Sequence, residues 1–315
     1  MPARAAERPE ATARDRHLAE AGVVVVMAFW AANFIVVKAV NQQIPPVTFA
    51  FLRFGLAALT LVLVLRWREG RLGLPRRDVV PILGLGALGF GVYQILWSTA
   101  LQDIPAGDSA LLVATTPVIT ALLAVVSGAD VLTRTKLLGS LVSFAGVAVI
   151  VSAGHGITLG SAIVGDVLTL IAAALWSVYT AFGAPILRRH SPLRTTAWAM
   201  VGGSLVLFLP GAYQAIGLDW GGISTDAWAG LVFSAFIPAG IANVVVFSAI
   251  KLLGPTRITA YQFLVPFMAV LMGAAFLAEP IRLDQLLGGI VIILGVAIAR
   301  VDRVTAFGGW LRPRP

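Results

Sequence analysis

The chain has 315 residues, of which 58% are hydrophobic and only 12% are charged. A soluble domain carries about a quarter charged residues, so this composition argues against a water-soluble enzyme or binding module. The formal net charge is +8. A basic balance can indicate a nucleic-acid partner, but here Lys and Arg cluster in short loops between apolar runs, which fits membrane topology better. No nucleic-acid partner is predicted.

The sequence gives little support for catalytic or metal chemistry. The chain has no cysteine, and His17, His155 and His190 lie outside the apolar runs. No metal site is predicted, and no cofactor is expected. An intramembrane enzyme would need a nucleophile elbow, a metal cluster or a deep carboxylate pair, and the sequence offers none of them. The protein is therefore predicted not to be an enzyme.

The apolar runs have the length of helices that cross a bilayer, which takes about 20 residues each. The first run follows a mixture of Arg and Glu and lacks a cleavage site, so we interpret it as a span and not as a signal peptide. The predicted fold class is an all-α integral membrane protein with ten transmembrane helices. These are expected near 21–40, 46–65, 80–101, 109–127, 136–153, 163–184, 195–213, 227–250, 257–278 and 283–300.

Basic residues alternate between the predicted loops. Twenty of the 23 Lys and Arg residues precede the first span or follow the second, fourth, sixth, eighth and tenth, whereas the loop 41–45 has none. The positive-inside rule then places both termini in the cytoplasm, as an N-terminal tail over 1–20 and a C-terminal tail over 301–315. The Ala-, Gly- and Arg-rich composition is compatible with a bacterial inner (plasma) membrane, which is the predicted location.

An internal repeat divides the chain into halves, predicted over 21–153 and 163–300. At an offset of 149 positions the halves share glycines, prolines and amides, namely Gly139 and Gly288, Gly146 and Gly295, Pro117 and Pro266, Gln94 and Asn243. Because each half holds five spans, an odd number, the second is predicted to be inverted relative to the first. Inverted repeats are typical of transporters, since two similar halves of opposite orientation provide states open to either side.

Four features follow one another along the first half and have counterparts in the second: Trp30-Ala31-Ala32-Asn33-Phe34, Phe49-Ala50-Phe51-Leu52-Arg53, Pro117, and Leu138-Gly139 through Gly146-Val147. Together they resemble the EamA repeat of the drug/metabolite transporter (DMT) superfamily, over about residues 20–300. The resemblance implies a ten-helix carrier with a central cavity, in a family made up mostly of exporters of amino acids, related metabolites or drugs. The second half departs from the pattern, because Ala199 stands at the position that matches Arg53.

Polar and aromatic residues near mid-depth are the candidates for substrate binding, because facing lipid costs them free energy and lining a wet cavity does not. Trp30 and Asn33 share a helix face, as do Trp176 and Tyr179. The other candidates are Arg53, Tyr93, Gln94, Trp97, Asn243, Tyr261 and Gln262. Ordinary interhelical hydrogen bonding explains any one of the amides equally well, and Trp97 is close enough to a helix end to be an interface anchor.

Arg53 has the deepest charge in the predicted spans. In one interpretation it extends toward the membrane surface and anchors its helix. In the other its guanidinium faces the cavity and binds a substrate carboxylate. The sequence leaves both open.

Glycines and prolines within the spans have structural interpretations. Gly84–Gly89 matches the G-x-G-x-x-G dinucleotide fingerprint, but it lies inside a span with no preceding strand, so close helix packing is favoured. Gly139 and Gly146 are seven residues apart, as are their counterparts in the second half, which predicts close-packing seams. Pro117 and Pro266 each remove a backbone hydrogen bond in mid-helix, so both are predicted helix kinks.

The predicted function is secondary transport by alternating access around a central cavity, with export of amino acids or related zwitterions favoured. A multidrug or lipophilic-metabolite exporter is the first alternative, and a channel or non-transporting scaffold is the second. No Asp or Glu is predicted deep in a span, which disfavours direct proton coupling and favours facilitated transport or exchange. The predicted partners are a small-molecule substrate and the lipid bilayer, and a homo-oligomer is compatible with the sequence but not required.

Overall fold

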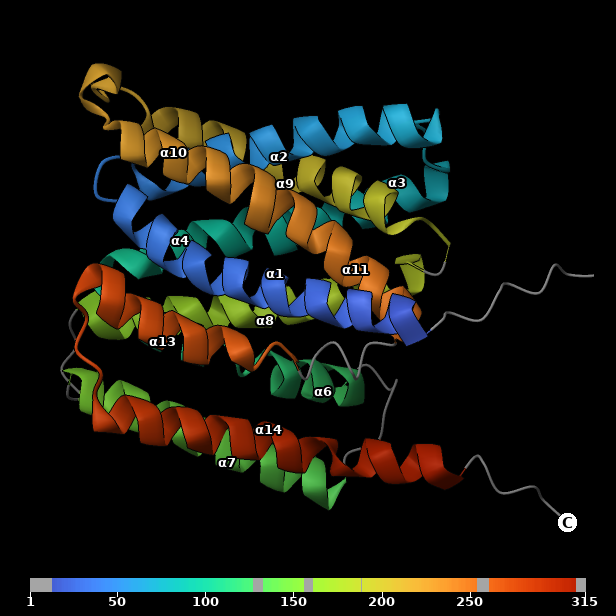
Figure 1. Cartoon of the computed structure of the whole chain (residues 1–315), viewed down its shortest axis with the longest axis vertical. Coiled ribbons are helices and arrows are strands. Elements are labelled where there is room, and N and C mark those ends of the chain that lie inside the picture. Colours follow the sequence, from blue (N-terminus) through green and yellow to red (C-terminus); the bar gives the residue numbers. More distant parts are fainter. Residues whose placement is uncertain (1–12, 127–132, 156–160, 188, 254–260, 310–315) are drawn as a thin grey trace, which may run out of the picture.

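A computed structural model describes residues 13–126, 133–155, 161–187, 189–253 and 261–309. Within these ranges the regular elements are helices, and no strand occurs. The helices run roughly parallel in one bundle (Figure 1). They are α1 Ala13–Val40, α2 Pro46–Glu69, α3 Arg76–Gly86, α4 Tyr93–Asp103, α5 Ala106–Val113, α6 Thr116–Val126, α7 Arg134–His155, α8 Ser161–Leu187, α9 Pro192–Gln214, α10 Thr225–Ser234, α11 Ala242–Leu253, α13 Leu264–Leu277 and α14 Leu283–Gly309, with π-helical segments η1 Ala87–Val92 and η3 Ala235–Ile241 and a short 3₁₀ turn η2 Trp220–Gly222.

Local sequence signals set several helix ends. Pro46 occupies the first turn of α2, where its missing N–H is not needed. Gly70 follows the last residue of α2 and caps it with φ of 68°, a left-handed conformation that suits glycine. The hydroxyl of Ser191 caps α9 by accepting a hydrogen bond from the Arg194 backbone N–H at 3.1 Å. Ser224 caps α10 in the same way.

Seven helical stretches of the described residues are long and apolar enough to cross a membrane, and Leu264–Leu277 and Leu283–Ala299 are shorter apolar helices. The start of the predicted span 257–278 lies outside the described residues. Large apolar side chains such as Leu205, Phe267 and Leu294 are more than half exposed on the outside of the bundle. Such a surface suits lipid, so the protein is a multi-pass membrane protein.

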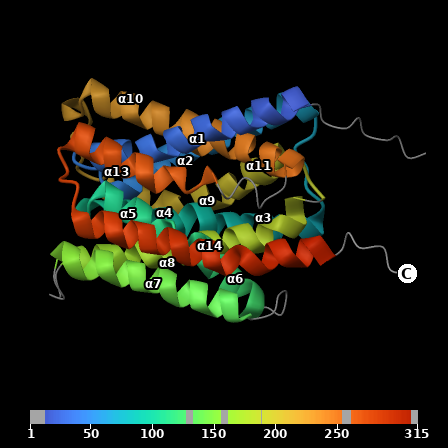
Figure 2. The same ribbon diagram turned by 60° about the horizontal axis from the view of Figure 1, so that its bottom comes forward.

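The described part of the chain starts and finishes at the same end of the bundle. The N-terminal end of α1 and the C-terminal end of α14 both lie on the right in Figure 1, and Figure 2 shows the same arrangement from another angle. We call this the terminal end. The opposite end, where α1 finishes and α14 begins, is called the Lys38 end.

Helices α7 and α14, from opposite halves of the chain, lie side by side along one edge of the bundle (Figure 1). A Cβ atom added to Gly139 would lie 2.5 Å from the carbonyl oxygen of Gly295, and one added to Gly146 would lie 2.6 Å from that of Gly288. Because no side chain fits between these backbones, the predicted glycine seams are confirmed, and they face each other.

Two of the three dinucleotide-like glycines, Gly86 and Gly89, serve packing as predicted, whereas nothing lies within 4 Å of a Cβ added to Gly84. A Cβ on Gly89 would lie 2.6 Å from the Tyr179 ring, and one on Gly91 would lie 2.8 Å from Val206 of α9. Gly86 is in direct contact with the backbone of Ala199, the residue that stands where a second Arg53 would be. These contacts bring α3 and η1 against α9.

Candidate substrate-binding cavity

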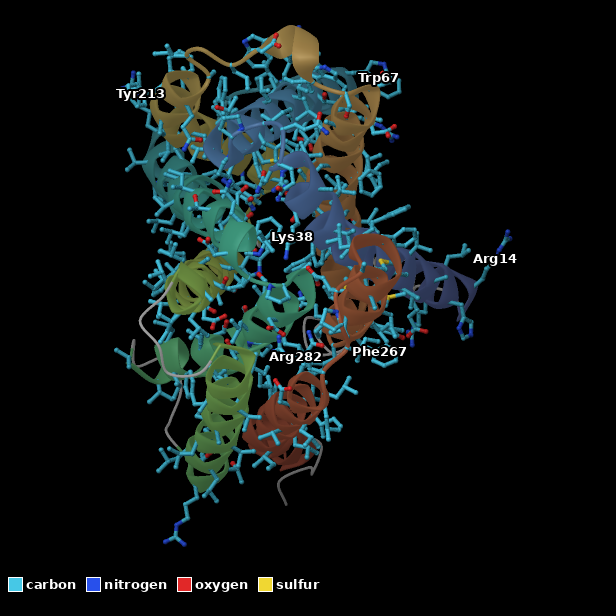
Figure 3. All side chains as sticks on the ribbon, turned by 90° about the vertical axis from the view of Figure 1, so that its left-hand side faces the viewer. Arg14, Lys38, Trp67, Tyr213, Phe267 and Arg282 are labelled. Atoms are coloured by element: carbon cyan, nitrogen blue, oxygen red, sulfur yellow. The ribbon has the colours of Figure 1, made fainter. Side chains whose placement is uncertain are left out.

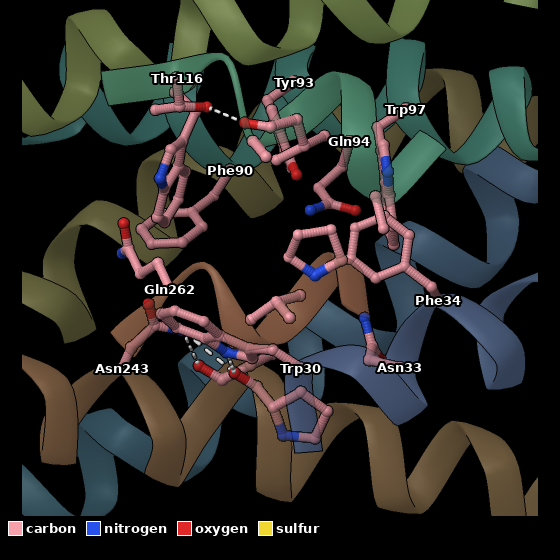
Figure 4. A pocket seen from close by; sticks show the side chains of 18 of the residues that line it. Trp30, Asn33, Phe34, Phe90, Tyr93, Gln94, Trp97, Thr116, Asn243 and Gln262 are labelled. Carbon is pink, nitrogen blue, oxygen red and sulfur yellow. Dashed lines mark hydrogen bonds between the residues drawn. The ribbon is translucent and has the colours of Figure 1, made fainter. Parts of the chain in front are cut away.

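A cavity of about 140 Å³ lies among the helices. Its walls come from both halves of the chain, and Figure 4 shows the side chains of α4 facing those of α1 across an open centre. The lining residues are Trp30, Asn33, Phe34, Arg53, Phe54, Phe90, Tyr93, Gln94, Trp97, Ala110, Val113, Ala114, Thr116, Pro117, Trp176, Pro238, Ala239, Asn243, Gln262, Phe263, Val265 and Pro266.

Irregular helix geometry borders the cavity on two sides. The π-helical segments η1 and η3 each precede a helix that carries a cavity amide, Gln94 on α4 and Asn243 on α11. π-helical turns leave backbone carbonyls without their usual partners and often occur at functional sites. Here the carbonyl of Pro238 accepts hydrogen bonds from Trp30 Nε1 and from Asn243 Nδ2, both at 3.2 Å.

The two candidate kink prolines border the cavity as well. Helix α5 ends at Val113 and α6 begins at Thr116, one residue before Pro117. In the second half a turn at Gln262 and Phe263 precedes α13, whose third residue is Pro266. Both helices are thus interrupted where they meet the cavity, and non-helical backbone is tolerated at membrane depth where it borders such a space.

Arg53 lies buried in the cavity wall, with 3% of its surface exposed. Its Nη1 donates to the Ser234 hydroxyl at 3.1 Å, and its Nη2 donates to Gln94 Oε1 at 2.8 Å. Its guanidinium carbon lies 4.5 Å from the centre of the Phe54 ring, within the range of a cation–π interaction. Its Nε has no hydrogen-bond partner, and no described carboxylate forms an ion pair with it. The cavity therefore borders a positive charge that no carboxylate of the described residues neutralises.

Aromatic rings form much of the remaining wall. Trp97 stacks on Tyr93 with 6.1 Å between ring centres, and Tyr93 lies 5.6 Å from Trp176. Phe34 meets Trp97 edge to face at 5.0 Å. Rings packed against one another in this way are held in place, so the wall offers rigid apolar surface to a ligand.

Nine of the eleven residues predicted for the site line this one cavity, and Tyr179 and Tyr261 do not. The ring of Tyr179 is buried against Phe90 at 4.9 Å, and Tyr261, like Trp30, packs against a neighbouring apolar cluster. The lining residues that sequence reasoning missed include the four phenylalanines Phe34, Phe54, Phe90 and Phe263. Phenylalanine in an apolar span carries no signal that separates a cavity wall from a lipid-facing surface.

Ion pairs join the two halves of the chain at the Lys38 end. Lys38 Nζ lies 2.7 Å from Glu279 Oε1, and the same carboxylate accepts from the backbone N–H of Ala106 at the start of α5. Arg282 donates to Asp108 at 3.1 Å. Figure 3 looks at the bundle from this end, with Lys38 and Arg282 near the middle of the cross-section. Burial lowers the pKa of Arg282, but the carboxylates of Asp108 and Asp284 outweigh it and hold that pKa above its ordinary value, so Arg282 stays charged.

A second set of ion pairs joins the halves at the terminal end. Asp78 on α3 is 2% exposed and lies 2.8 Å from His190 Nε2 and 2.9 Å from Arg189 Nη2. Glu69 pairs with Arg194 at 2.9 Å. Both ends of the bundle are therefore bridged between halves, with the cavity between them. Among the described residues no group of three His, Cys, Asp or Glu side chains could hold a metal ion.

Comparison with known proteins gives consistent matches. The model of the EamA-like transporter family matches residues 17–152 and 163–301. The chain is similar to a probable terminal-alkyne amino-acid exporter of Streptantibioticus cattleyicolor, with 30% identity over 88% of this chain and 91% of that protein. It also resembles the uncharacterised transporter YyaM of Bacillus subtilis, with 26% identity over 86% and 90% of the two chains.

A third relative is a probable amino-acid metabolite efflux pump of Salmonella typhimurium, with 27% identity over 87% of this chain and 92% of that protein. A solved crystal structure shares the fold with a TM-score of 0.64 and 18% identity, covering 90% of this chain and 99% of its own. Since the family model covers most of the residues in two successive copies, this chain belongs to the EamA-like transporter family and is a membrane transporter, not an enzyme.

Proposed function

We propose that this protein exports a small metabolite that carries a carboxylate, an amino acid or a related zwitterion, through the cavity between its halves. The observation that carries the proposal is Arg53, a buried guanidinium in the cavity wall that no described carboxylate neutralises. A charge at that depth needs a partner or water, and a substrate carboxylate is a partner that reaches it only during transport. Two relatives named as amino-acid or amino-acid-metabolite exporters support the substrate class.

The geometry around Arg53 favours substrate recognition over helix anchoring. An anchoring arginine extends its guanidinium toward the membrane surface, where water solvates it. Here the guanidinium is instead held inside the bundle by Gln94 and Ser234. Both of these groups are neutral, so the positive charge remains available to a carboxylate.

The proposed mechanism is alternating access by two inverted five-helix repeats, over 21–153 and 163–300, in a ten-helix bundle. Several paired features support the repeat. The π-helical segment η3 lies close to the position 149 residues after η1, and a helix interruption precedes both Pro117 and Pro266. Inter-half ion pairs at both ends are bonds that would break in turn as the cavity opens to either side.

We further propose that the terminal end is cytoplasmic and the Lys38 end faces outward, in a bacterial inner membrane. The basic loop between α2 and α3 supports this orientation. The chain has no cysteine, so Gly73→Cys provides a unique label, and Gly73 has open space around it. Reaction of this cysteine with an impermeant reagent added outside intact cells would show that the protein has the opposite orientation.

The substrate proposal is tested with purified protein in liposomes, by counterflow of radiolabelled amino acids and of their amides. Arg53→Gln keeps a polar side chain and removes the charge. We expect a KM at least tenfold higher for carboxylate substrates, because a hydrogen bond to a charged group contributes about 1.5–3 kcal/mol, and a much smaller change for the amides. Arg68→Gln, at the exposed end of the same helix, is the matched control. Equal losses for acids and amides, or a loss only of folded protein, would assign Arg53 an anchoring role.

Export of lipophilic compounds is the second candidate, and the aromatic wall favours it. Phe34, Phe54, Phe90, Trp97 and Trp176 all line the cavity. Inhibition of counterflow by structurally unrelated apolar compounds, with no inhibition by amino acids, would replace the first proposal with this one.

A further inference from the structure

Two aspartates lie buried near the Lys38 end, outside the cavity lining. Asp108, in the first turn of α5, is 1% exposed, and Asp166, near the start of α8, is 2% exposed. They belong to opposite halves of the chain. Two carboxylates that share a site cannot both ionise without strong repulsion unless cations neutralise both.

Asp108 is fully engaged. Its Oδ2 accepts from Arg282 at 3.1 Å, and its Oδ1 accepts from Gln285 at 2.8 Å. Arg282 also bonds Asp284, at 3.2 Å. The Arg282 guanidinium therefore already forms ion pairs with two carboxylates, Asp108 and Asp284.

Among the described residues, Asp166 lacks the hydrogen bonds that neutralise Asp108. Its Oδ2 is buried without a hydrogen-bond partner among the residues that the structure describes. The charged groups that act on it are Asp108, which repels its negative charge, and Arg282, which attracts it. Of the other described charges near this end, Asp103 on α4 and Asp284 carry the same sign as Asp166, and Lys38 pairs with Glu279. The cluster of Asp108, Asp166, Asp284 and Arg282 thus has three carboxylates and a single cation.

Helix α8 packs closely against the end of α4 next to Asp166. A Cβ added to its neighbour Gly165 would lie 2.8 Å from Ile104 and 3.1 Å from the Ala100 carbonyl, so α8 and the end of α4 are in close contact. Two further buried oxygens, Thr169 Oγ1 and Gln285 Oε1, have no partner in the described part of the chain. A neutral carboxylic acid fits such surroundings, whereas a carboxylate without a donor does not.

We propose that Asp166 is a proton-binding site that controls opening of the Lys38 end. It carries a proton while the Asp108–Arg282 bridge is closed and releases it to water when the bridge opens. The only bond that forms or breaks in Asp166 is its O–H bond, and the proton comes from and returns to the solution on that side. This role lies outside the cavity and does not depend on which substrate is transported.

The sign of the pH effect follows from this arrangement. The closed end binds one more proton than the open end, so lowering the pH favours closure and raising it favours opening. The ratio of open to closed protein should rise with pH by up to about tenfold per unit, the limit for one linked proton. The sequence had disfavoured proton coupling because Asp166 is near a span end, but burial, and not depth alone, decides whether a carboxylate keeps its proton.

The experiment measures opening without a substrate. Ala110→Cys places a single thiol in the cavity wall, two residues after Asp108, and an impermeant maleimide is added from outside to protein in liposomes between pH 5.5 and 8. Thiol reactivity itself rises with pH, so each rate is divided by the rate for the same cysteine in the Asp166→Asn background, which mimics the protonated acid. Asp284→Asn, a partly exposed member of the same cluster, is the matched control.

We expect the normalised labelling rate to rise with pH when Asp166 is present, also in the Asp284→Asn background. A flat normalised rate, a rise that depends on Na⁺ concentration at fixed pH, or a rise that Asp284→Asn removes would overturn the proposal. If Asp166→Asn does not fold, free cysteine in solution provides the normalisation, and a flat ratio for Asp166-containing protein again overturns it. Failure of the carboxylate proposal for Arg53 would leave these labelling rates unchanged.

Discussion

The α7–α14 seam and the central cavity are both places where the two halves of the chain meet, but opposite kinds of residue form them. In the seam, Gly139 and Gly146 face Gly295 and Gly288 at backbone contact, and no space remains. In the cavity, tryptophans and phenylalanines keep the backbones apart, and amides and one arginine occupy the gap. The size of the side chains at the contact therefore decides whether two membrane helices pack closely together or leave a cavity between them.

The energetics of the two regions differ accordingly. In lipid there is little hydrophobic driving force between helices, so the seam depends on close van der Waals contact, which any added atom disrupts. The cavity instead tolerates changes in packing but depends on particular polar groups. Substitutions in the seam should therefore affect folding, and substitutions in the cavity should affect transport.

The largest effect is expected for Gly139→Leu in the seam. The new side chain would have to displace the backbone of α14, because even a Cβ atom would lie 2.5 Å from the Gly295 carbonyl. We expect loss of most folded, membrane-inserted protein, measured by size-exclusion chromatography of detergent extracts. Gly84→Leu is the matched control, since nothing lies within 4 Å of its added Cβ. Equal yields of folded protein for the two variants would show that close packing of α7 against α14 is not needed for folding.

A smaller effect, confined to transport, is expected for Trp30→Ala and Trp176→Ala. Both indoles line the cavity, and that of Trp30 also donates to the Pro238 carbonyl at the π-helical segment η3. We expect counterflow rates to fall by about tenfold while the midpoint of thermal unfolding falls less than for Gly139→Leu, because each indole is only partly buried and has one side on the open cavity. Trp67→Ala, whose side chain is 79% exposed, should match the unchanged protein. Normal transport by either cavity variant would show that its tryptophan is not part of the substrate-binding site.

Polar residues in apolar spans made much of the cavity predictable from the sequence. An amide or a guanidinium in a membrane helix needs a reason to be there, so Asn33, Arg53 and Gln94 could be identified one by one. The same argument predicted the glycine seams, because glycines at seven-residue spacing have few other uses in a span.

Helix periodicity alone was a weaker guide. Trp30 and Asn33 both reach the cavity, whereas Tyr179, at the same spacing from Trp176, turns to the ring of Phe90. Residues three apart differ by about 60° in direction, which is enough to move a side chain from a cavity to the next helix. The Asp108–Arg282 bridge was not predictable either, because its partners are 174 positions apart and each lies near a helix end.

The smallest effect on folding is expected for two single-cysteine variants that compare solvent access directly. Gln262→Cys places a thiol in the cavity wall, and Ser143→Cys places one in the seam, where the Ser143 backbone already contacts the site of a Cβ on Gly295. Serine and cysteine are similar in size, and Gln262 is partly exposed, so both variants should fold. A water-soluble maleimide should react readily with the first thiol and hardly at all with the second until the protein is denatured. Since the natural chain has no cysteine, any labelling reports the introduced site. Labelling of Ser143→Cys in the folded protein would mean that water enters the seam. The α7–α14 seam and the central cavity would then no longer differ in solvent access.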